Sequence, residues 1–120
     1  MSELLPLYFY RATIRKVYDG DTIRADINLG FGTLLEYESF RLYGIDTPEV
    51  TGESKAAGIR ARDFVRELLP LGTVTKMRSF QDKQGKYGRY LAVFYLPNGQ
   101  NLNQILVDSG HAVAFMTGDA

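Results

Sequence analysis

The chain has 120 residues, 45% of them apolar and 12% aromatic, which is the composition of a folded domain and not of a disordered segment. Its 14 basic residues balance its 14 acidic ones, so net charge alone does not indicate a nucleic-acid partner. The absence of cysteine excludes a disulfide framework and a thiolate metal site. We expect a single domain over residues 1–120.

The first eleven residues, MSELLPLYFYR, contain no basic segment followed by a long apolar run. A signal peptide is therefore not expected, and no stretch of about 20 apolar residues predicts a membrane helix. We expect no membrane partner. The compartment stays open: cytoplasmic for the chain as it stands, or secreted if a leader has been removed.

The N-terminal part of the chain predicts three strands in succession. Residues 8–17 are rich in β-branched and aromatic side chains, and residues 22–29 alternate apolar and polar side chains as a half-buried strand does. A third strand over residues 34–43 follows Gly30 and Gly32, which mark a turn. These three strands are expected to form a meander.

Apolar side chains then recur at helical spacing over residues 54–69, with Ser54 as the expected N-cap. Two more strands are predicted over residues 73–80 and 90–96, and a short helix over residues 103–109. Five strands with a helix between the third and fourth are typical of an OB-type barrel. We predict a mainly β fold with helices (α+β): a five-stranded OB-fold barrel, the helix between strands 3 and 4, and a short C-terminal helix.

The segment VYDGDT, residues 17–22, joins the first two predicted strands. Its Asp-Gly pair is typical of a hairpin turn, but such a turn needs only Asp19 and leaves Asp21 unexplained at the start of the next strand. Either the turn is simply polar, or the second carboxylate holds a ligand.

The segment FRLYGIDTPE, residues 40–49, brings three oxygen donors together in sequence: the carboxylates of Asp46 and Glu49 and the carbonyl of Thr47. Oxygen donors of this kind suit hard cations such as calcium or magnesium. One segment cannot complete such a site, and Asp21 is the natural further donor. Taken alone, DTPE is equally typical of a loop that leads into a helix.

Two arginines add a possible phosphate-binding element. Arg41 lies five residues before Asp46, and Arg89 ends the glycine-containing segment DKQGKYGR. A guanidinium group matches phosphate oxygens in a bidentate way. Beside a cation held by carboxylates, the two arginines would form a site for phosphoryl transfer, in which a carboxylate orients or deprotonates water.

The charges are unevenly distributed despite their zero sum. Residues 76–89 carry five basic side chains against one acidic side chain, whereas residues 19–53 carry eight acidic side chains against two arginines. A metal-dependent phosphodiesterase would need this separation, although solvated loops account for it without any function.

Read in order, VYDGDT, FRLYGIDTPE and DKQGKYGR resemble the staphylococcal nuclease (thermonuclease) family, and the resemblance extends from about residue 12 to about residue 113. The segment NLNQILVDSGHA is similar to the second helix of that family. The resemblance implies an OB-fold barrel that hydrolyses DNA and RNA with calcium. The lysine-rich loop that often follows DTPE in the family is represented here by the short TGESKAAG.

For the metal, the resemblance implies that Asp21, Asp46 and the Thr47 carbonyl are calcium ligands. Asp19 matches an aspartate in the outer coordination sphere. This suggests why VYDGDT has two aspartates: the first serves the turn, and the second faces the ion.

For the reaction, the resemblance implies that Glu49 orients or deprotonates the attacking water. Arg41 and Arg89 match the arginines that bind the phosphate and stabilise the transition state. Tyr87 matches a tyrosine near the substrate phosphate, and we expect its neighbour Lys86 to bind substrate as well.

We therefore predict a calcium-dependent nuclease that acts on DNA and RNA with low sequence specificity, favours single strands and leaves 3′-phosphate ends. We expect it to be a monomer. Two alternatives stay open: a nucleic-acid- or protein-binding module on the same fold without catalysis, and an OB-fold binder of single strands without a metal. The enzyme is favoured by the presence of the whole set of charged residues, namely Asp21, Arg41, Asp46, Glu49 and Arg89.

Overall fold

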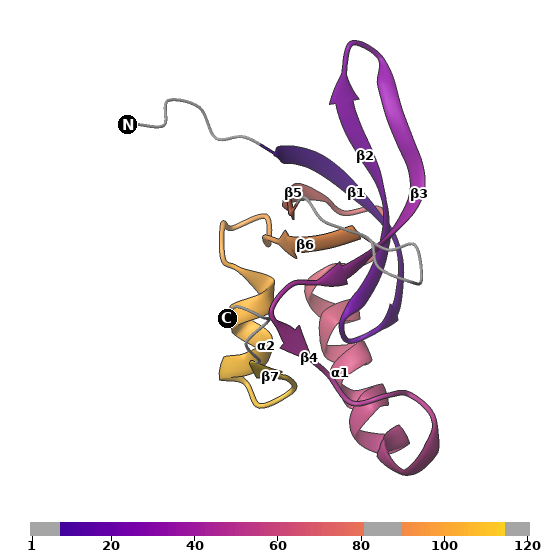
Figure 1. Ribbon diagram of the computed structural model, residues 1–120, viewed down its shortest axis with the longest axis vertical. Helices are drawn as coiled ribbons and strands as arrows, with labels where there is room; N and C mark the ends of the chain where they lie inside the picture. Colours follow the sequence, from indigo (N-terminus) through magenta and orange to yellow (C-terminus); the bar gives the residue numbers. More distant parts are fainter. Residues whose placement is uncertain (1–7, 81–89, 115–120) are drawn as a thin grey trace.

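The computed structural model describes residues 8–80 and 90–114 (Figure 1). Its elements, in chain order, are β1 (Phe9–Asp19), β2 (Thr22–Gly30), β3 (Thr33–Leu42), β4 (Ile45–Asp46), a 3₁₀ turn (Gly52–Ser54), α1 (Lys55–Leu68), β5 (Val74–Phe80), β6 (Tyr90–Phe94), α2 (Leu102–Asp108) and β7 (Val113–Ala114). The five longer strands and both helices agree with the predicted ranges to within two residues at each end.

Strands β1, β2, β3, β6 and β5 form a closed barrel in that order. The β3–β6 pair is parallel, and the other neighbours are antiparallel. Helix α1 lies between β3 and β5 in the chain, which confirms the predicted OB-type barrel, mainly β with helices.

Apolar side chains from every barrel strand fill the interior, among them Ile14, Ile23, Phe40, Met77 and Phe94, each at most 3% exposed. The helices complete this core with Val65 from α1 and with Leu102 and Leu106 from α2. The alternation predicted for β2 is present, because Ile23, Ala25 and Ile27 are all buried. Neither helix in the described part of the chain is long and apolar enough to cross a membrane.

Two short strands were not predicted. In the small β4–β7 sheet, Ile45 pairs with Ala114 and Asp46 pairs with Val113. Two-residue strands show no readable period, which is why the sequence pattern did not indicate them. The pairing matters for function because it fixes the beginning of the DTPE segment against the C-terminal part of the described chain.

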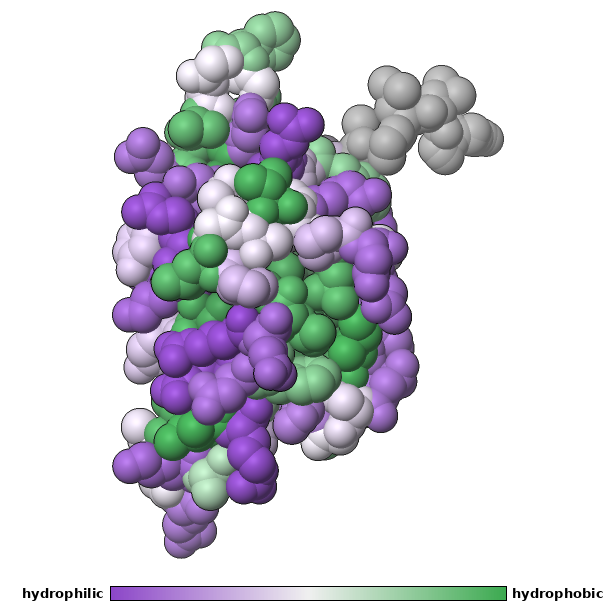
Figure 2. Space-filling view, turned by 180° about the vertical axis from the view of Figure 1, so that it is seen from behind, coloured by the Kyte–Doolittle hydropathy of each residue, from purple (hydrophilic) through white to green (hydrophobic). Residues whose placement is uncertain are grey.

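The β2–β3 hairpin projects from the barrel (Figure 1). Its turn places Gly30, Phe31 and Gly32 at positive φ, and the Phe31 side chain is fully exposed. Apolar side chains gather at this end of the molecule (Figure 2). The opposite ends of the same two strands, where they join β1 and β4, form the pocket described next.

Candidate active site

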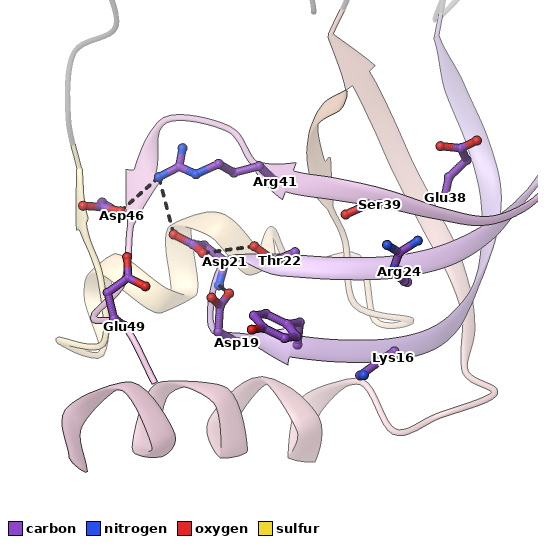
Figure 3. A pocket seen from close by; sticks show the side chains of 11 residues that line it. Lys16, Asp19, Asp21, Thr22, Arg24, Glu38, Ser39, Arg41, Asp46 and Glu49 are labelled. Carbon is purple, nitrogen blue, oxygen red and sulfur yellow. Dashed lines mark hydrogen bonds and ion pairs between the residues drawn. The ribbon is translucent and has the colours of Figure 1, made fainter. Parts of the chain in front are cut away.

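A pocket of about 690 Å³ opens beside the β1–β2 turn (Figure 3). Its lining includes five of the residues singled out from the sequence, namely Asp19, Asp21, Arg41, Asp46 and Glu49. The two motif segments VYDGDT and FRLYGIDTPE therefore meet in space at one site.

The two aspartates of the VYDGDT turn make different contacts. The Asp19 carboxylate accepts a hydrogen bond from the backbone N–H of Asp21 at 3.2 Å and so caps the turn. Asp21 points into the pocket, and its residue is 6% exposed. Gly20 allows the turn to pack this tightly, because a Cβ there would come within 2.9 Å of Ala61 and Thr47 side-chain atoms.

The Asp21 carboxylate is held by both neighbouring segments. It accepts hydrogen bonds from the backbone N–H of Thr47 at 3.2 Å and from the Thr22 hydroxyl at 3.4 Å. Because Thr47 belongs to the DTPE segment, the first of these bonds joins the two motifs directly.

Arg41 lies between two carboxylates (Figure 3). Its Nη2 donates to Asp46 at 2.9 Å and approaches Asp21 at 3.5 Å. The Asp46 side chain is 60% exposed, whereas the Asp21 side chain is only 9% exposed. The arginine therefore bridges one buried and one accessible carboxylate.

Burial raises the pKa of Asp21, and the neighbouring Asp19 carboxyl raises it further. The Thr47 N–H and the Arg41 guanidinium lower the pKa and offset part of this effect. Ionised Asp21 is thus less stable in the folded protein than an exposed carboxylate would be. A cation bound beside it would stabilise the ionised form.

The donors at the site are of the right kind for a hard cation. Asp21 and Asp46 are both within reach of one guanidinium, and Glu49 lines the same pocket. Calcium takes six to eight oxygen ligands and accepts water among them. In residues 8–80 and 90–114 the acidic, histidine and cysteine side chains form no cluster of three or more that could hold a metal by itself, so solvent or substrate would have to supply further ligands.

Thr47 is buried, and its hydroxyl oxygen has no hydrogen-bond partner within the described residues. This unsatisfied oxygen lies on the residue whose carbonyl the sequence suggested as a ligand. The hydroxyl faces the β1–β2 turn, because a Cβ on Gly20 would be 2.9 Å from this oxygen, and Thr47 is not among the residues that line the pocket.

Glu49 is exposed, and its carboxylate points toward the space beside Asp46 and Asp21 (Figure 3). Its backbone carbonyl accepts a hydrogen bond from the Ser54 hydroxyl at 3.3 Å. The predicted N-cap position of Ser54 is confirmed. Its side chain makes no capping hydrogen bond, because the hydroxyl is engaged with Glu49.

Gly58 lets helix α1 lie directly against the main chain of Glu49. A Cβ at position 58 would be 2.0 Å from the Glu49 carbonyl oxygen, so no side chain fits there. A role for Gly58 was not predicted from the sequence. Its signal was a glycine in the middle of an otherwise good helix, where it costs about 1 kcal/mol relative to alanine and so indicates a close contact.

Three of the predicted site residues, Lys86, Tyr87 and Arg89, lie outside the described residues. Their assignments stay predictions. Conversely, the pocket includes Lys16, Tyr18 and Arg24, which the sequence analysis did not single out.

The comparisons with known proteins agree with these motifs. A family model described as staphylococcal nuclease homologue matches residues 39–119. An uncharacterized protein of Methanocaldococcus jannaschii is 30% identical over 131 aligned residues, which cover 90% of this chain and 60% of the relative.

Two proteins of Escherichia coli, one of them from strain O157:H7, are each named an uncharacterized endonuclease. Both are 34% identical to this chain over 97 residues, which cover 81% of the chain and 56% of the relative. The chain thus spans 56% to 60% of the length of these three relatives.

Proposed function

The chain belongs to the staphylococcal nuclease homologue family, and we propose that it is a calcium-dependent nuclease that hydrolyses phosphodiester bonds of DNA and RNA with low sequence specificity. One observation carries the proposal: Asp21, Arg41 and Asp46 are joined at one pocket that Glu49 also lines. This arrangement puts carboxylates for a cation and for water beside a guanidinium group for phosphate.

In this proposal, Asp21, Asp46 and the Thr47 carbonyl hold calcium, which neutralises charge on the bound phosphate. The guanidinium of Arg41 binds non-bridging phosphate oxygens and stabilises the charge that they gain in the transition state. Arg89 is the second such donor. Tyr87 and Lys86 contact the substrate near the same phosphate.

Glu49 acts on the attacking water. Its carboxylate is exposed to the pocket, so it can accept a proton as the water oxygen forms its bond to phosphorus. The bond between phosphorus and the 5′ oxygen breaks, and the 5′ oxygen takes a proton from solvent. The products are a 3′-phosphate end and a 5′-hydroxyl end, as in the family that the motifs resemble.

The depth of the site supports a preference for single strands. Asp21 is only 6% exposed, so the scissile phosphate has to approach a recessed group. A flexible strand can bring one phosphate into the pocket without unpairing, whereas a duplex must first be deformed. The proposed active unit is a monomer, since Asp21, Arg41, Asp46 and Glu49 line one pocket without a second chain.

The rival function is a binding module on the same fold without catalysis. It would need the barrel but not a carboxylate aimed at water. The four catalytic-type residues in the described chain, Asp21, Arg41, Asp46 and Glu49, all face one pocket, and this favours the enzyme.

The test is to incubate the purified protein with plasmid DNA and with RNA in calcium, in magnesium or in excess chelator. We expect cleavage of both polymers in calcium and little in magnesium, because magnesium demands near-octahedral geometry that an irregular oxygen site does not provide. Analysis of the products should find phosphate at the 3′ ends.

Robust cleavage in excess chelator would contradict the metal assignment. A folded protein that binds both polymers but cleaves neither in any of the ions would instead support the binding module.

A further inference from the structure

The pocket continues beyond the acidic residues onto the outer face of β1, β2 and β3, where Lys16 and Arg24 also line it (Figure 3). The pairing of β1 with β2 shifts between Ile14 and Lys16, so Arg15 is an extra residue in β1. Because of this bulge, Lys16 pairs directly with Arg24, while Val17 points into the core. Two cations therefore stand opposite each other on neighbouring strands.

Like charges in direct cross-strand pairs are destabilising, and proteins usually separate or neutralise them. In residues 8–80 and 90–114 neither Lys16 nor Arg24 forms an ion pair with a carboxylate. The neighbouring Arg15 is different, since it pairs with Asp26 at 2.9 Å. Glu38 also lines the pocket, but it forms no ion pair with either cation. An unneutralised pair of this kind suits an anionic ligand.

Arg24 is held in a defined position. Its Nη1 donates to the backbone carbonyl of Tyr37 at 2.7 Å, and its guanidinium lies 4.7 Å from the centre of the Tyr37 ring. A cation fixed in this way loses little conformational freedom when it binds a phosphate.

Tyr18 adds an aromatic surface to the same part of the pocket. Its residue is 54% exposed, so the ring is accessible to a ligand. The Lys16 ammonium lies 5.8 Å from the centre of the ring. An exposed aromatic ring beside cations is the combination that single-strand-binding proteins use to stack a base and hold its phosphate.

The distance between the cationic residues and the acidic site matches the length of a short piece of nucleic acid. Arg24 lies in β2, three residues after Asp21, which directly precedes that strand. At the rise of a β-strand three residues span about 10 Å. An extended strand of nucleic acid can span that length with one or two nucleotides. A phosphate at the acidic site and a phosphate at Lys16 and Arg24 can therefore belong to the same strand.

We propose that Lys16, Arg24 and Tyr18 form a nucleotide subsite that binds a phosphate and base flanking the scissile phosphate of single-stranded nucleic acid. The subsite rests on the proposed nuclease function for its place beside the reaction. It takes single strands because a base has to leave its helical stack to lie against Tyr18.

The test measures binding of a fluorescein-labelled oligothymidylate by anisotropy across a salt series, in calcium, with the Glu49→Gln protein as the non-cleaving parent. Lys16→Gln combined with Arg24→Gln should reduce the slope of log affinity against log salt by about 0.7, since the subsite holds one phosphate and each single-strand phosphate contact contributes about 0.7. The single Lys16→Gln variant should give a smaller change, because Arg24 still contacts that phosphate. Arg60→Gln on α1, an exposed arginine outside the pocket, should leave both affinity and slope unchanged.

The stacking role of Tyr18 is tested by removing or keeping its aromatic ring. Tyr18→Ser should weaken binding by roughly 5- to 100-fold, the range that stacking of one base provides. Tyr18→Phe keeps the ring and should bind like the parent. Circular dichroism and thermal unfolding of each variant confirm that the fold is kept.

Unchanged affinity and slope in the Lys16/Arg24 double variant, equal loss in Tyr18→Ser and Tyr18→Phe, or no binding by the parent would each overturn the subsite. The readout does not depend on cleavage. If the wild-type protein binds as predicted but hydrolyses nothing, the nuclease proposal fails and the subsite stands. If it cleaves nucleic acid but the variants bind normally, the nuclease proposal stands and the subsite fails.

Discussion

The two ends of the pocket differ in how their charges are held. At the acidic end, Asp21 and Asp46 share the Arg41 guanidinium, and Asp21 is almost completely buried. At the cationic end, Lys16 and Arg24 face each other without a carboxylate partner in the described chain. The acidic end therefore holds one carboxylate in place by burial and hydrogen bonds, whereas the cationic end leaves its charge accessible to a polyanion.

The difference also has an energetic side. A buried carboxylate is costly when it is ionised, and here hydrogen bonds from Thr47 and Thr22 hold it. The charges at the cationic end destabilise the fold less, because water screens exposed charges. Substitutions at the acidic end should therefore change turnover and stability together, while those at the cationic end should change mainly affinity.

The largest expected effect is on turnover, at the acidic end. Glu49→Gln keeps the size of the side chain but removes the group that accepts a proton, so kcat should fall by roughly 10²- to 10⁴-fold. Affinity for a single-stranded oligonucleotide should change little. Steady-state cleavage kinetics measure the loss, and Glu53→Gln, an exposed carboxylate in the neighbouring 3₁₀ turn, is the matched control. Near-normal turnover in Glu49→Gln would remove it from the mechanism.

Arg41→Lys should come next. Lysine keeps the positive charge but loses the planar fork that spans Asp46 and phosphate oxygens, and the loss of one transition-state donor costs about 10²- to 10³-fold in rate. The same loss is expected for Arg89→Lys. Single-turnover rates at saturating protein measure it, with Arg60→Lys as the control. A variant that kept its full rate would show that charge alone suffices at that position.

Gly58→Ala should affect the acidic end through the fold. An added methyl group would be 2.0 Å from the Glu49 carbonyl oxygen, so α1 or the DTPE segment has to move. Such overpacking typically costs 1–3 kcal/mol of unfolding free energy, about as much as or more than the roughly 1 kcal/mol that alanine gains in helix propensity. The free energy of unfolding, measured with denaturant, and the turnover should both fall. Ala56→Ser, on the exposed face of α1, should change neither greatly. Increased stability in Gly58→Ala would contradict the close contact.

The smallest effect concerns stability without metal. Because burial raises the pKa of Asp21, its ionised form destabilises the fold, and this cost develops as the pH rises through the folded-state pKa. In chelator at neutral pH, Asp21→Asn should therefore unfold at a slightly higher temperature than the wild-type protein, and the gap should close at acid pH. Thermal unfolding at several pH values measures it. A lower Tm for the variant at every pH would mean that the hydrogen bonds from Arg41 and Thr47 outweigh the burial.

Much of the fold could be predicted because its signals are local. Alternation in β2 and helical spacing in α1 are repeated over many residues and mark the elements to within two residues. The β1 bulge is less visible, although the buried positions Ala12, Ile14 and Val17 do break strict alternation. That break is what turns Lys16 toward Arg24, and only the register of the barrel shows it.

Part of the candidate site could also be predicted from the sequence, and part of it depends on tertiary structure. Asp21, Asp46 and Glu49 could be chosen because VYDGDT and FRLYGIDTPE occur together in the order of the family that they resemble. Taken alone, carboxylates beside a turn or a proline are typical of ordinary loops. The bridge that Arg41 makes between two of them depends on tertiary geometry that spacing does not contain. Gly58 is marked in the sequence only as a glycine inside a helix, which indicates some close contact but not that the contact is with the Glu49 backbone.

The most direct test of the account is to measure kcat and KM for one single-stranded oligonucleotide in calcium with three proteins: wild type, Glu49→Gln, and the Lys16→Gln/Arg24→Gln double variant. We expect calcium-dependent cleavage by the wild type, a large fall in kcat with little change in KM for the first variant, and a higher KM with nearly unchanged kcat for the second. This expectation would be contradicted if Glu49→Gln cleaved as fast as the wild type, or if the double variant lost kcat at saturating substrate while its KM stayed the same.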